Sequence, residues 1–450
     1  MRPTSGLNVT RTFLFTALLG SALVSVAATN DFPFTASGQK PAWLSELSFS
    51  TRESYDNNIF LSGADARYYP AYSAPSGSAV AYKNSSAWVT TLTPKVGFNL
   101  LPFWNGQGSL QTLSLAYAPE CAIYQNHSSE NFQAHRIVAA MKGKSDDVSF
   151  GVDNNFSFVN GDRTAPFYPG NFLSAYGIAA PRERREQLQD RANVLVQYDQ
   201  PHWFARATGS LLYYDLMTRL INTPGYQNFC DRYDANGGGD VGFKILPQLA
   251  FTVGWRYGHQ YQQSFSFSPY NSSSDYQRVL FGLEGKPLSW LEFKFQAGPD
   301  FRSYNSAAPV NDANCVKYFG EGSLTATITT NDSVAIKYKQ WQWVSSTGKV
   351  PCFDTACDLN YHHQFSSKLG LDLAGRFLEA DYHSGNLPTC HRDDTEYVAS
   401  TGLTYAVNAH LNFTATAELD FGRNDQPNLA NPSTRDFNRQ LYSLGAQWKF

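Results

Sequence analysis

Cysteine and histidine residues near the C-terminal third are of the types that hold zinc. Cys352 and Cys357 are followed by His362 and His363. Structural zinc sites use closely spaced cysteine pairs, and this spacing does not provide one. Adjacent residues of a strand point to opposite faces, so in a strand these two histidines cannot both chelate one ion. The sequence therefore predicts no metal site here.

Two glycine-containing segments resemble ligand loops without completing them. Gly143-Lys144-Ser145 matches the end of a phosphate-loop motif, but the motif requires an earlier glycine at a position that Val138 occupies here. The stretch 234–240 is rich in Asp, Asn and Gly, but the closing carboxylate of an EF-hand would be Ile245. We predict no cofactor, and a looser calcium site in a flexible glycine-rich loop is the alternative for 234–240.

A catalytic nucleophile with a partner is not recognisable in the chain. No Gly-x-Ser-x-Gly motif is present, and the histidines that fall near a predicted loop-bearing rim, His259, His383 and His391, have no recognisable partner. We therefore predict that the protein is not an enzyme. An alternative is a hydrolase with its site at a membrane surface, but no residue pattern in the sequence supports it.

The composition is unusual for a globular enzyme. Aromatic residues make up 15% of the 450 residues, while charged residues make up 16%, against roughly 25% in soluble domains. The mean hydropathy is nevertheless −0.37. Such a chain fits a wall with one face in lipid and one in water. The net charge of −3, without a basic stripe, predicts no nucleic-acid partner.

The N-terminus has the layout of a secretory signal peptide. Arg2 and Arg11 form a positive region before an apolar run over 13–26, and small residues follow up to Ala28. We predict a signal peptide over 1–28, a periplasmic segment over 29–44 and a barrel over 45–450. A retained N-terminal anchor is the alternative, although the run is shorter than the roughly 20 residues of a spanning helix.

Beyond residue 44 the dominant pattern is alternation of apolar and polar side chains. In 441–450 the apolar set falls on one face, and the polar set falls on the other. The same pattern recurs in 249–257, 291–297 and 412–421. Runs of about ten alternating residues are what tilted strands need to cross a bilayer. We predict an all-β, antiparallel, up-and-down transmembrane barrel.

The connections between these runs are of two kinds. Short ones include 199–201, 246–248, 286–288, 330–332 and 407–409. Long polar ones are predicted over 60–85, 159–189, 216–239, 261–274, 303–315, 345–357, 384–394 and 423–437. Short turns at the periplasmic rim and long extracellular loops are typical of outer-membrane barrels. The pattern gives about 18 strands (16–18), with a turn or bulge expected near Gly375.

The C-terminus resembles that of bacterial outer-membrane β-barrel porins. Trp448 and the terminal Phe450 match the signature that the barrel assembly machinery reads in these proteins. The stretch 53–60 is similar to an opening motif of a group known as β-barrel porin type 2. The resemblance implies a pore in the outer membrane, with membrane lipid and the assembly machinery as partners.

In general porins the loop after the fifth strand folds into the barrel, and 159–189 holds that place here. We hypothesise that the charged run in this loop contributes to a constriction of the pore. The alternative is that it belongs to a solvated external loop. The candidates are Arg182, Glu183, Arg184, Arg185 and Glu186.

Polar positions of the strands should line a water-filled lumen. Bases slightly outnumber acids among the charged ones, so we predict passive diffusion of small hydrophilic solutes, neutral or anionic, including sugars. Pairing of these charges across neighbouring strands is the alternative. Polysaccharide export is the second transport role, and a secreted β-rich adhesin is a further alternative; the oligomeric state stays open. The predicted lining residues are Lys95, Asp153, Arg206, Lys244, Arg256, Arg278, Glu284, Glu292, Lys294, Lys337, Lys339, Glu418, Asp420 and Lys449.

All six cysteines fall in or beside predicted external loops, and export would expose them to an oxidising compartment. We expect up to three disulfides, with Cys352–Cys357 as the favoured local pair and free thiols as the alternative. The candidates are Cys121, Cys230, Cys315, Cys352, Cys357 and Cys390.

Overall fold

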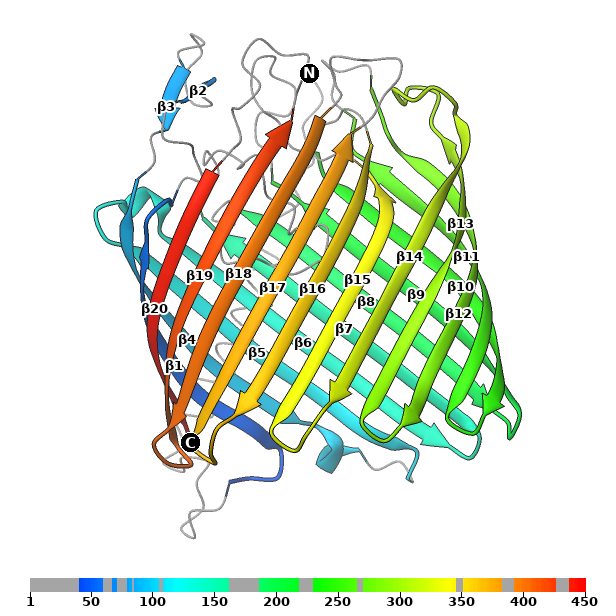
Figure 1. Cartoon of the computed structure of the whole chain (residues 1–450), viewed down its shortest axis with the longest axis horizontal. Helices are drawn as coiled ribbons and strands as arrows, with labels where there is room; N and C mark the ends of the chain where they lie inside the picture. The colour runs from blue at the N-terminus through cyan, green and yellow to red at the C-terminus, as the bar shows by residue number, and fades with distance from the viewer. Residues whose placement is uncertain are drawn as a thin grey trace.

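The computed structural model of the chain is a closed barrel of 18 antiparallel strands (Figure 1). It describes residues 40–59, 67–70, 79–82, 85–104, 108–161, 186–217, 230–264, 270–344, 351–382, 392–425 and 437–450. The predicted fold class and strand number are confirmed. The predicted signal peptide over 1–28 lies outside the described residues, and the first strand begins at Leu44.

The strands follow each other around the wall in chain order. They are β1 (Leu44–Asp56), β4 (Ala87–Asn99), β5 (Leu110–Tyr124), β6 (Phe132–Ser145), β7 (Val148–Asn160), β8 (Gln187–Asp199), β9 (Trp203–Asp215), β10 (Arg232–Leu246), β11 (Leu249–Gln262), β12 (Ser274–Leu288), β13 (Leu291–Tyr304), β14 (Asn314–Thr327), β15 (Asp332–Trp343), β16 (Cys352–Gln364), β17 (Leu369–Tyr382), β18 (Arg392–Ala406), β19 (Leu411–Asp425) and β20 (Phe437–Lys449). A separate pair, β2 (Arg67–Pro70) and β3 (Ala79–Tyr82), lies between β1 and β4.

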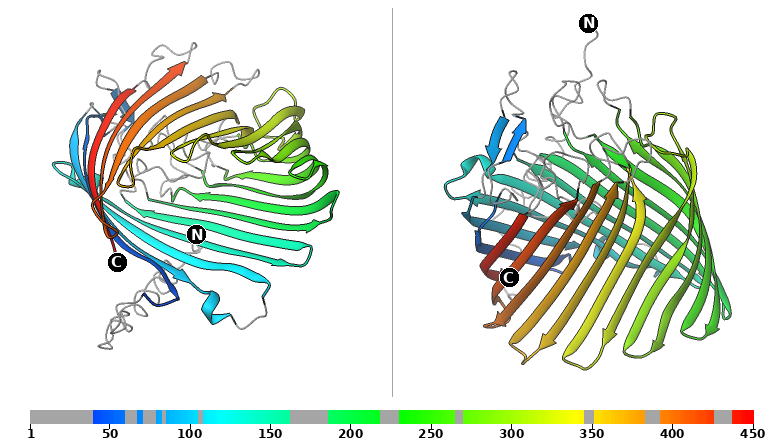
Figure 2. Two further views of the ribbon diagram at one scale, coloured as in Figure 1. Left: turned by 60° about the horizontal axis from the view of Figure 1, so that its bottom comes forward. Right: turned by 45° about the horizontal axis from the view of Figure 1, so that its top comes forward.

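The barrel closes between its first and last strands. β1 pairs with β20 from Ser48↔Lys449 to Asp56↔Leu441, so the blue and red strands lie side by side in both views of Figure 2. Closure leaves no sheet edge at this junction. Because lipid offers no hydrogen-bond partners to the backbone, only such self-pairing lets strands cross a membrane.

The two ends of the barrel differ in their connections. At one end, two residues join β6 to β7 and β10 to β11, and the C-terminus lies at this end (Figure 1). A 3₁₀ turn, η1 (Leu101–Phe103), follows β4 there. The opposite end carries the longer connections, including η2 (Ser128–Glu130). In outer-membrane barrels this asymmetry assigns the first end to the periplasm and the second to the outside.

Strand boundaries correct several predicted connections. Residues 286–288 belong to β12, and the turn lies at 289–290. Residues 232–239, predicted as part of a long loop, begin β10, while 352–357 begin β16. The glycine-rich part of β10 is therefore in the wall. A side chain at Gly238 would lie 2.0 Å from the carbonyl oxygen of Trp255, which explains glycine there.

The bulge expected near Gly375 is not present. β17 pairs with β18 without a register shift, and Gly375 lies opposite Ala399. Leu371, Leu373 and Phe377 occupy the same face as Gly375, so the apolar phase continues through the glycine. Because Gly375 has no side chain, the alternation of apolar and polar residues is interrupted at this position in the sequence, although the strand continues in register.

No helix among the described residues is long and apolar enough to span a membrane.

Candidate functional site

Each strand sorts its side chains between an outer and an inner face. On β11, Trp255 is 48% exposed and Tyr257 49%, while Arg256 between them is 8% exposed. The same division holds along β12, where Phe281 is exposed and Arg278 and Leu280 are buried. The exposed aromatic face is the outer one, since a cavity lies on the opposite face.

The strand registers place all 14 predicted lining residues on the inner face. Arg206, for example, lies opposite Asp240 on the next strand, and Glu284 lies opposite Lys294. Their surroundings differ strongly. Arg206, Arg256, Arg278 and Asp420 are buried, whereas Glu292, Lys294, Lys337 and Lys449 are exposed.

A buried charge cluster joins four neighbouring strands, β9 to β12. Asp240 is 2.9 Å from Arg206 and 2.7 Å from Arg256, and Glu284 is 2.9 Å from Arg206. Gly254 makes room for it, because a Cβ there would lie 2.2 Å from Oδ1 of Asp240. The carboxylates in this cluster compensate its two guanidinium groups, so it contributes little net field to the lumen.

A second cluster lies toward the extracellular end and was only partly predicted. Arg278 and Arg302 both bind Oδ2 of Asp300, at 2.8 and 3.0 Å. The guanidinium of Arg278 also stacks 4.2 Å from the ring centre of Phe319. Asp300 and Arg302 flank the outward Phe301, and alternation in β13 could have identified them.

The extracellular end of β15 folds into the lumen, which the sequence did not predict. Its ladder with β14 ends at Gly320↔Gln340. The next four residues, 341–344, are all buried, whereas a wall strand would bury alternate ones. The Gln342 carbonyl accepts hydrogen bonds from Arg302 (3.2 Å) and Gln260 (3.0 Å) on β13 and β11. This end therefore packs against the inside of the neighbouring wall, at β11 and β13.

An apolar cluster fixes the folded-in segment. It joins inner-face residues of β9, β12 and β14 to residues of β15, β16 and β17, and its members are Tyr214, Leu280, Phe319, Trp341, Trp343, Val344, Cys352, Ala356, Leu378 and Ala380. Apolar burial of this kind excludes water. The water-accessible lumen is thus displaced toward the other side of the barrel.

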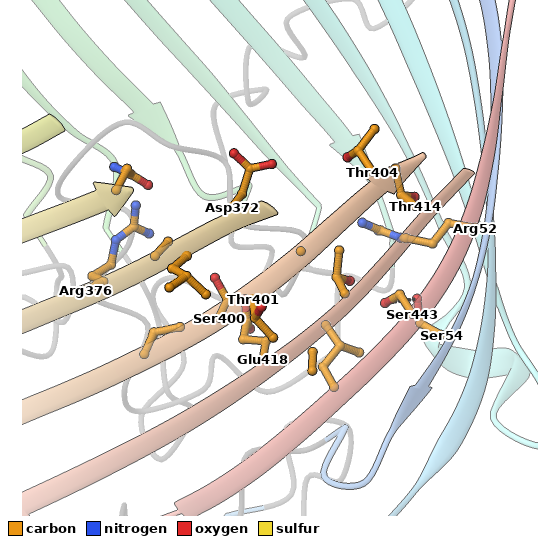
Figure 3. A pocket seen from close by; sticks show the side chains of 18 of the residues that line it. Arg52, Ser54, Asp372, Arg376, Ser400, Thr401, Thr404, Thr414, Glu418 and Ser443 are labelled. Atoms are coloured by element: carbon orange, nitrogen blue, oxygen red, sulfur yellow. Dashed lines mark hydrogen bonds between the residues drawn. The ribbon is translucent and has the colours of Figure 1, made fainter. Parts of the chain in front are cut away.

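That other side holds a cavity of about 540 Å³ (Figure 3). β1, β4, β5, the start of β6 and β15 to β20 form its wall. The lining mixes apolar side chains with many hydroxyl and charged groups, and the latter include Arg52, Ser54, Asp56, Thr91, Glu120, Asp358, Asp372, Arg376, Ser400, Thr404, Thr414, Glu418, Arg439 and Ser443. The sequence analysis had named Glu418 alone among these.

Most charges of the cavity are paired. Arg439 binds Asp56 at 2.6 Å and lies 3.5 Å from Glu418. Arg376 binds Asp358 on the adjacent strand. Two further carboxylates also have partners: Glu120 pairs with Arg136, and Asp372 binds His362.

Arg52 differs from the other arginines of the cavity. It is exposed, and it forms no hydrogen bond or ion pair with any residue that the structure describes. It lies opposite Gly445, which lies opposite Thr414, which in turn lies opposite Thr404. A Cβ at Gly445 would be 2.7 Å from the Thr414 hydroxyl. Glycine at 445 therefore leaves room for the Thr414 hydroxyl, and Arg52, Thr414 and Thr404 line the cavity from neighbouring strands (Figure 3).

The constriction candidates fall mostly outside the described residues. Arg182, Glu183, Arg184 and Arg185 lie in the undescribed stretch 162–185. Glu186 is described and buried beside the start of β8.

The favoured disulfide prediction was wrong. Cys352 and Cys357 both lie on β16, the first buried on the inner face and the second on the outer face. Five positions at about 3.3 Å each separate them, which no disulfide spans. Cys121 and Cys315 are free thiols as well. Cys230 is buried, and Cys390 lies outside the described residues.

The histidines of the zinc interpretation point to opposite faces, as predicted. His362 binds Asp372 at 2.8 Å, whereas His363 binds Asp332 at 2.7 Å. No cluster of metal-ligating side chains occurs among the described residues. His259 pairs with Asp275 at 2.8 Å, on the outer face of the wall.

The closed 18-strand barrel, its exposed aromatic outer face and its polar interior define a transmembrane β-barrel of the bacterial outer-membrane type. This confirms the class and location that the C-terminal strand predicted.

Several solved structures are similar to the chain. Pseudomonas aeruginosa OccK1 (OpdK) has a TM-score of 0.43 at 9% identity, covering 90% of this chain and 98% of that chain. Acinetobacter baumannii OccAB3 has a TM-score of 0.42 at 12% identity, covering 90% and 99%. Pseudomonas aeruginosa OccK2 (OpdF), solved in complex with glucuronate, has a TM-score of 0.43 at 10% identity, covering 91% of this chain and 100% of that chain. No protein-family model matches the sequence, and no curated protein matches it significantly.

Proposed function

We propose that the protein is a passive pore for small hydrophilic solutes, with a preference for anionic or neutral ones that carry hydroxyl groups. The observation that carries this proposal is the polar cavity inside the closed wall, with Arg52 exposed in it. Its volume of about 540 Å³ is in the range of roughly 300–1,000 Å³ that binds small molecules.

The charge pairing supports a site-specific preference rather than a general one. The clusters around Asp240 and Asp300 hold their arginines in ion pairs, so those arginines would attract solutes weakly. Arg52 is available to bind the carboxylate of a solute, and Thr404 and Thr414 can bind hydroxyl groups of the same solute. We assign the 14 inner-face residues to the path and Arg52 to the selective step.

The folded-in end of β15 supports a narrow path. Trp341 and Trp343 fill one side of the extracellular half, so solutes would pass along β1, β4, β5 and β16 to β20. The wall itself then narrows the lumen, whatever the loop at 159–189 contributes.

Planar-bilayer recordings test the proposal. Purified protein should give discrete conductance steps, and its reversal potential under a KCl gradient should show anion preference. Arg52→Ala should reduce that preference about fivefold, because a unit charge at about 4 Å in water contributes about 1 kcal/mol.

Arg423→Ala is the matched control, since it removes the same charge from the outer face, where Arg423 binds Gly422 and Asn438. It should leave selectivity unchanged. Liposome swelling with neutral monosaccharides measures uptake of uncharged solutes. Absence of both conductance and swelling from a folded protein would exclude a pore, and cation preference would exclude the role of Arg52.

A further inference from the structure

A groove of about 340 Å³ lies on the outer face of the barrel, across β11 to β14. Most of its lining side chains occupy outward positions, among them Tyr257, Asp275, Gln277, Phe301 and Ser303. These residues lie toward the extracellular ends of their strands. The groove is separate from the inner cavity described above.

The position of the groove along the strands places it beside lipid headgroups. Outward residues of β11 are apolar from Leu249 to Trp255, and then become Tyr257, His259 and Tyr261. A tilted strand crosses the hydrocarbon core in about 9–11 residues. Counted from Leu249, the hydrocarbon ends near Tyr257, so the groove faces the headgroup layer of the outer leaflet.

The groove combines exposed rings with hydrogen-bonding groups. Tyr257 is 49% exposed and Phe301 is 47% exposed. The Asp275 carboxylate accepts hydrogen bonds from Tyr257 (3.4 Å) and His259 (2.8 Å), yet its side chain is still 54% exposed. Aromatic faces pack against the C–H groups of a sugar ring, while carboxylate and amide groups bind its hydroxyls.

The charge of the groove selects sugar over phosphate. Among the described residues that line it, Arg302 is the one cation. Its side chain is fully buried and bound to Asp300 and Gln260, so it cannot reach a phosphate in the groove. The exposed Asp275 carboxylate would repel one.

The end of the β14–β15 ladder widens this surface. Beyond Gly320 no described strand pairs with this side of β14, and Tyr318 is 71% exposed there. Its ring extends the aromatic surface next to the groove.

We propose that this groove binds the saccharide part of a glycolipid in the outer leaflet. The proposal does not depend on pore function, because it concerns the opposite face of the wall.

Native mass spectrometry of the detergent-purified, folded barrel with lipopolysaccharide tests this. Wild-type protein should retain lipopolysaccharide, and its delipidated core oligosaccharide should compete. The variant Tyr257→Ala/Phe301→Ala should bind about tenfold more weakly, since each ring contributes a stacking contact. Tyr397→Ala is the matched control, because Tyr397 is an outward tyrosine that is 50% exposed on β18, away from the groove.

Heat-modifiable gel mobility would confirm that each variant is folded. Asp275→Asn and Gln277→Ala provide a second arm that keeps the rings and alters hydrogen bonding; weaker binding by both supports the proposal. Equal binding by wild type and the ring variant would overturn it. So would equal binding of lipid A without its core sugars, because acyl chains or phosphates would then carry the interaction.

Discussion

Removing the negative charge of Asp240 tests how the polar interior is held together. Asp240 receives Arg206 Nη2 at 2.9 Å and Arg256 Nη1 at 2.7 Å. The side chains of Asp240 and Arg206 are 3% and 6% exposed, so water cannot replace the lost contact. In Asp240→Asn, Arg206 would keep Glu284, whereas Arg256 would lose its counter-ion and keep only neutral acceptors, such as the backbone carbonyls of Gly239 and Trp255.

The magnitude follows from this loss of the counter-ion. Breaking a buried pair costs about 3–5 kcal/mol, because one charge is left uncompensated. The matched control is Glu46→Gln, which removes the partner of Lys95 in an ion pair of 2.6 Å. Both of those side chains are more than a third exposed, at 40% and 34%, and such surface pairs contribute about 0–1 kcal/mol.

Urea unfolding in lipid vesicles, followed by tryptophan fluorescence, measures both free energies of unfolding. We expect Asp240→Asn to lose at least 2 kcal/mol more than Glu46→Gln, taking the difference between about 3 and about 1 kcal/mol. A difference below 1 kcal/mol would refute the reasoning, since both pairs would then behave as solvent-exposed pairs and the interior around Asp240 would be wet.

Three further predictions follow from packing and register. Gly238→Ala should prevent assembly of the heat-modifiable barrel, because its Cβ would lie 2.0 Å from a backbone oxygen, whereas Gly375→Ala meets nothing within 4 Å and should assemble normally; equal yields of the two would contradict this. Trp343→Ala should lose about 3–5 kcal/mol of stability and raise single-channel conductance by emptying part of the lumen, and an unchanged conductance in the folded variant would speak against the narrowing. Peptide mapping under non-reducing conditions should find no bridge between Cys352 and Cys357, and its detection would show that the β16 register is wrong.

Alternation made the wall predictable. Because strand side chains have a period of two, Trp255 and Arg256 could be assigned to opposite faces without knowing any neighbour. The terminal Phe450 and the contrast between short and long connections gave the class of barrel in the same local way. Gly375 shows where this failed, since a glycine carries no polarity signal and hides the phase of its strand.

The partners of the polar side chains were not predictable to the same degree. Alternation places Arg52 and Arg206 on the inner face alike, yet one is exposed without an ion pair among described residues and the other is held by two carboxylates. The difference depends on which residues the registers bring opposite each arginine, and Gly445 rather than an acid stands beside Arg52. A register is a property of two strands, and a one-residue shift would change every pair.

The sequence by itself determined that the chain forms strands, how many there are, and which side chains meet lipid, because these depend on local periodicity and turn residues. Only the tertiary structure decided that the extracellular end of β15 separates from β14 and turns inward, that the cavity lies beside β1 and β20, and that the arginines around Asp240 and Asp300 are paired with carboxylates. These features arise from contacts between residues such as Arg302 and Gln342. The inward turn of β15 brings these two residues together, and the sequence of neither strand alone indicates their contact.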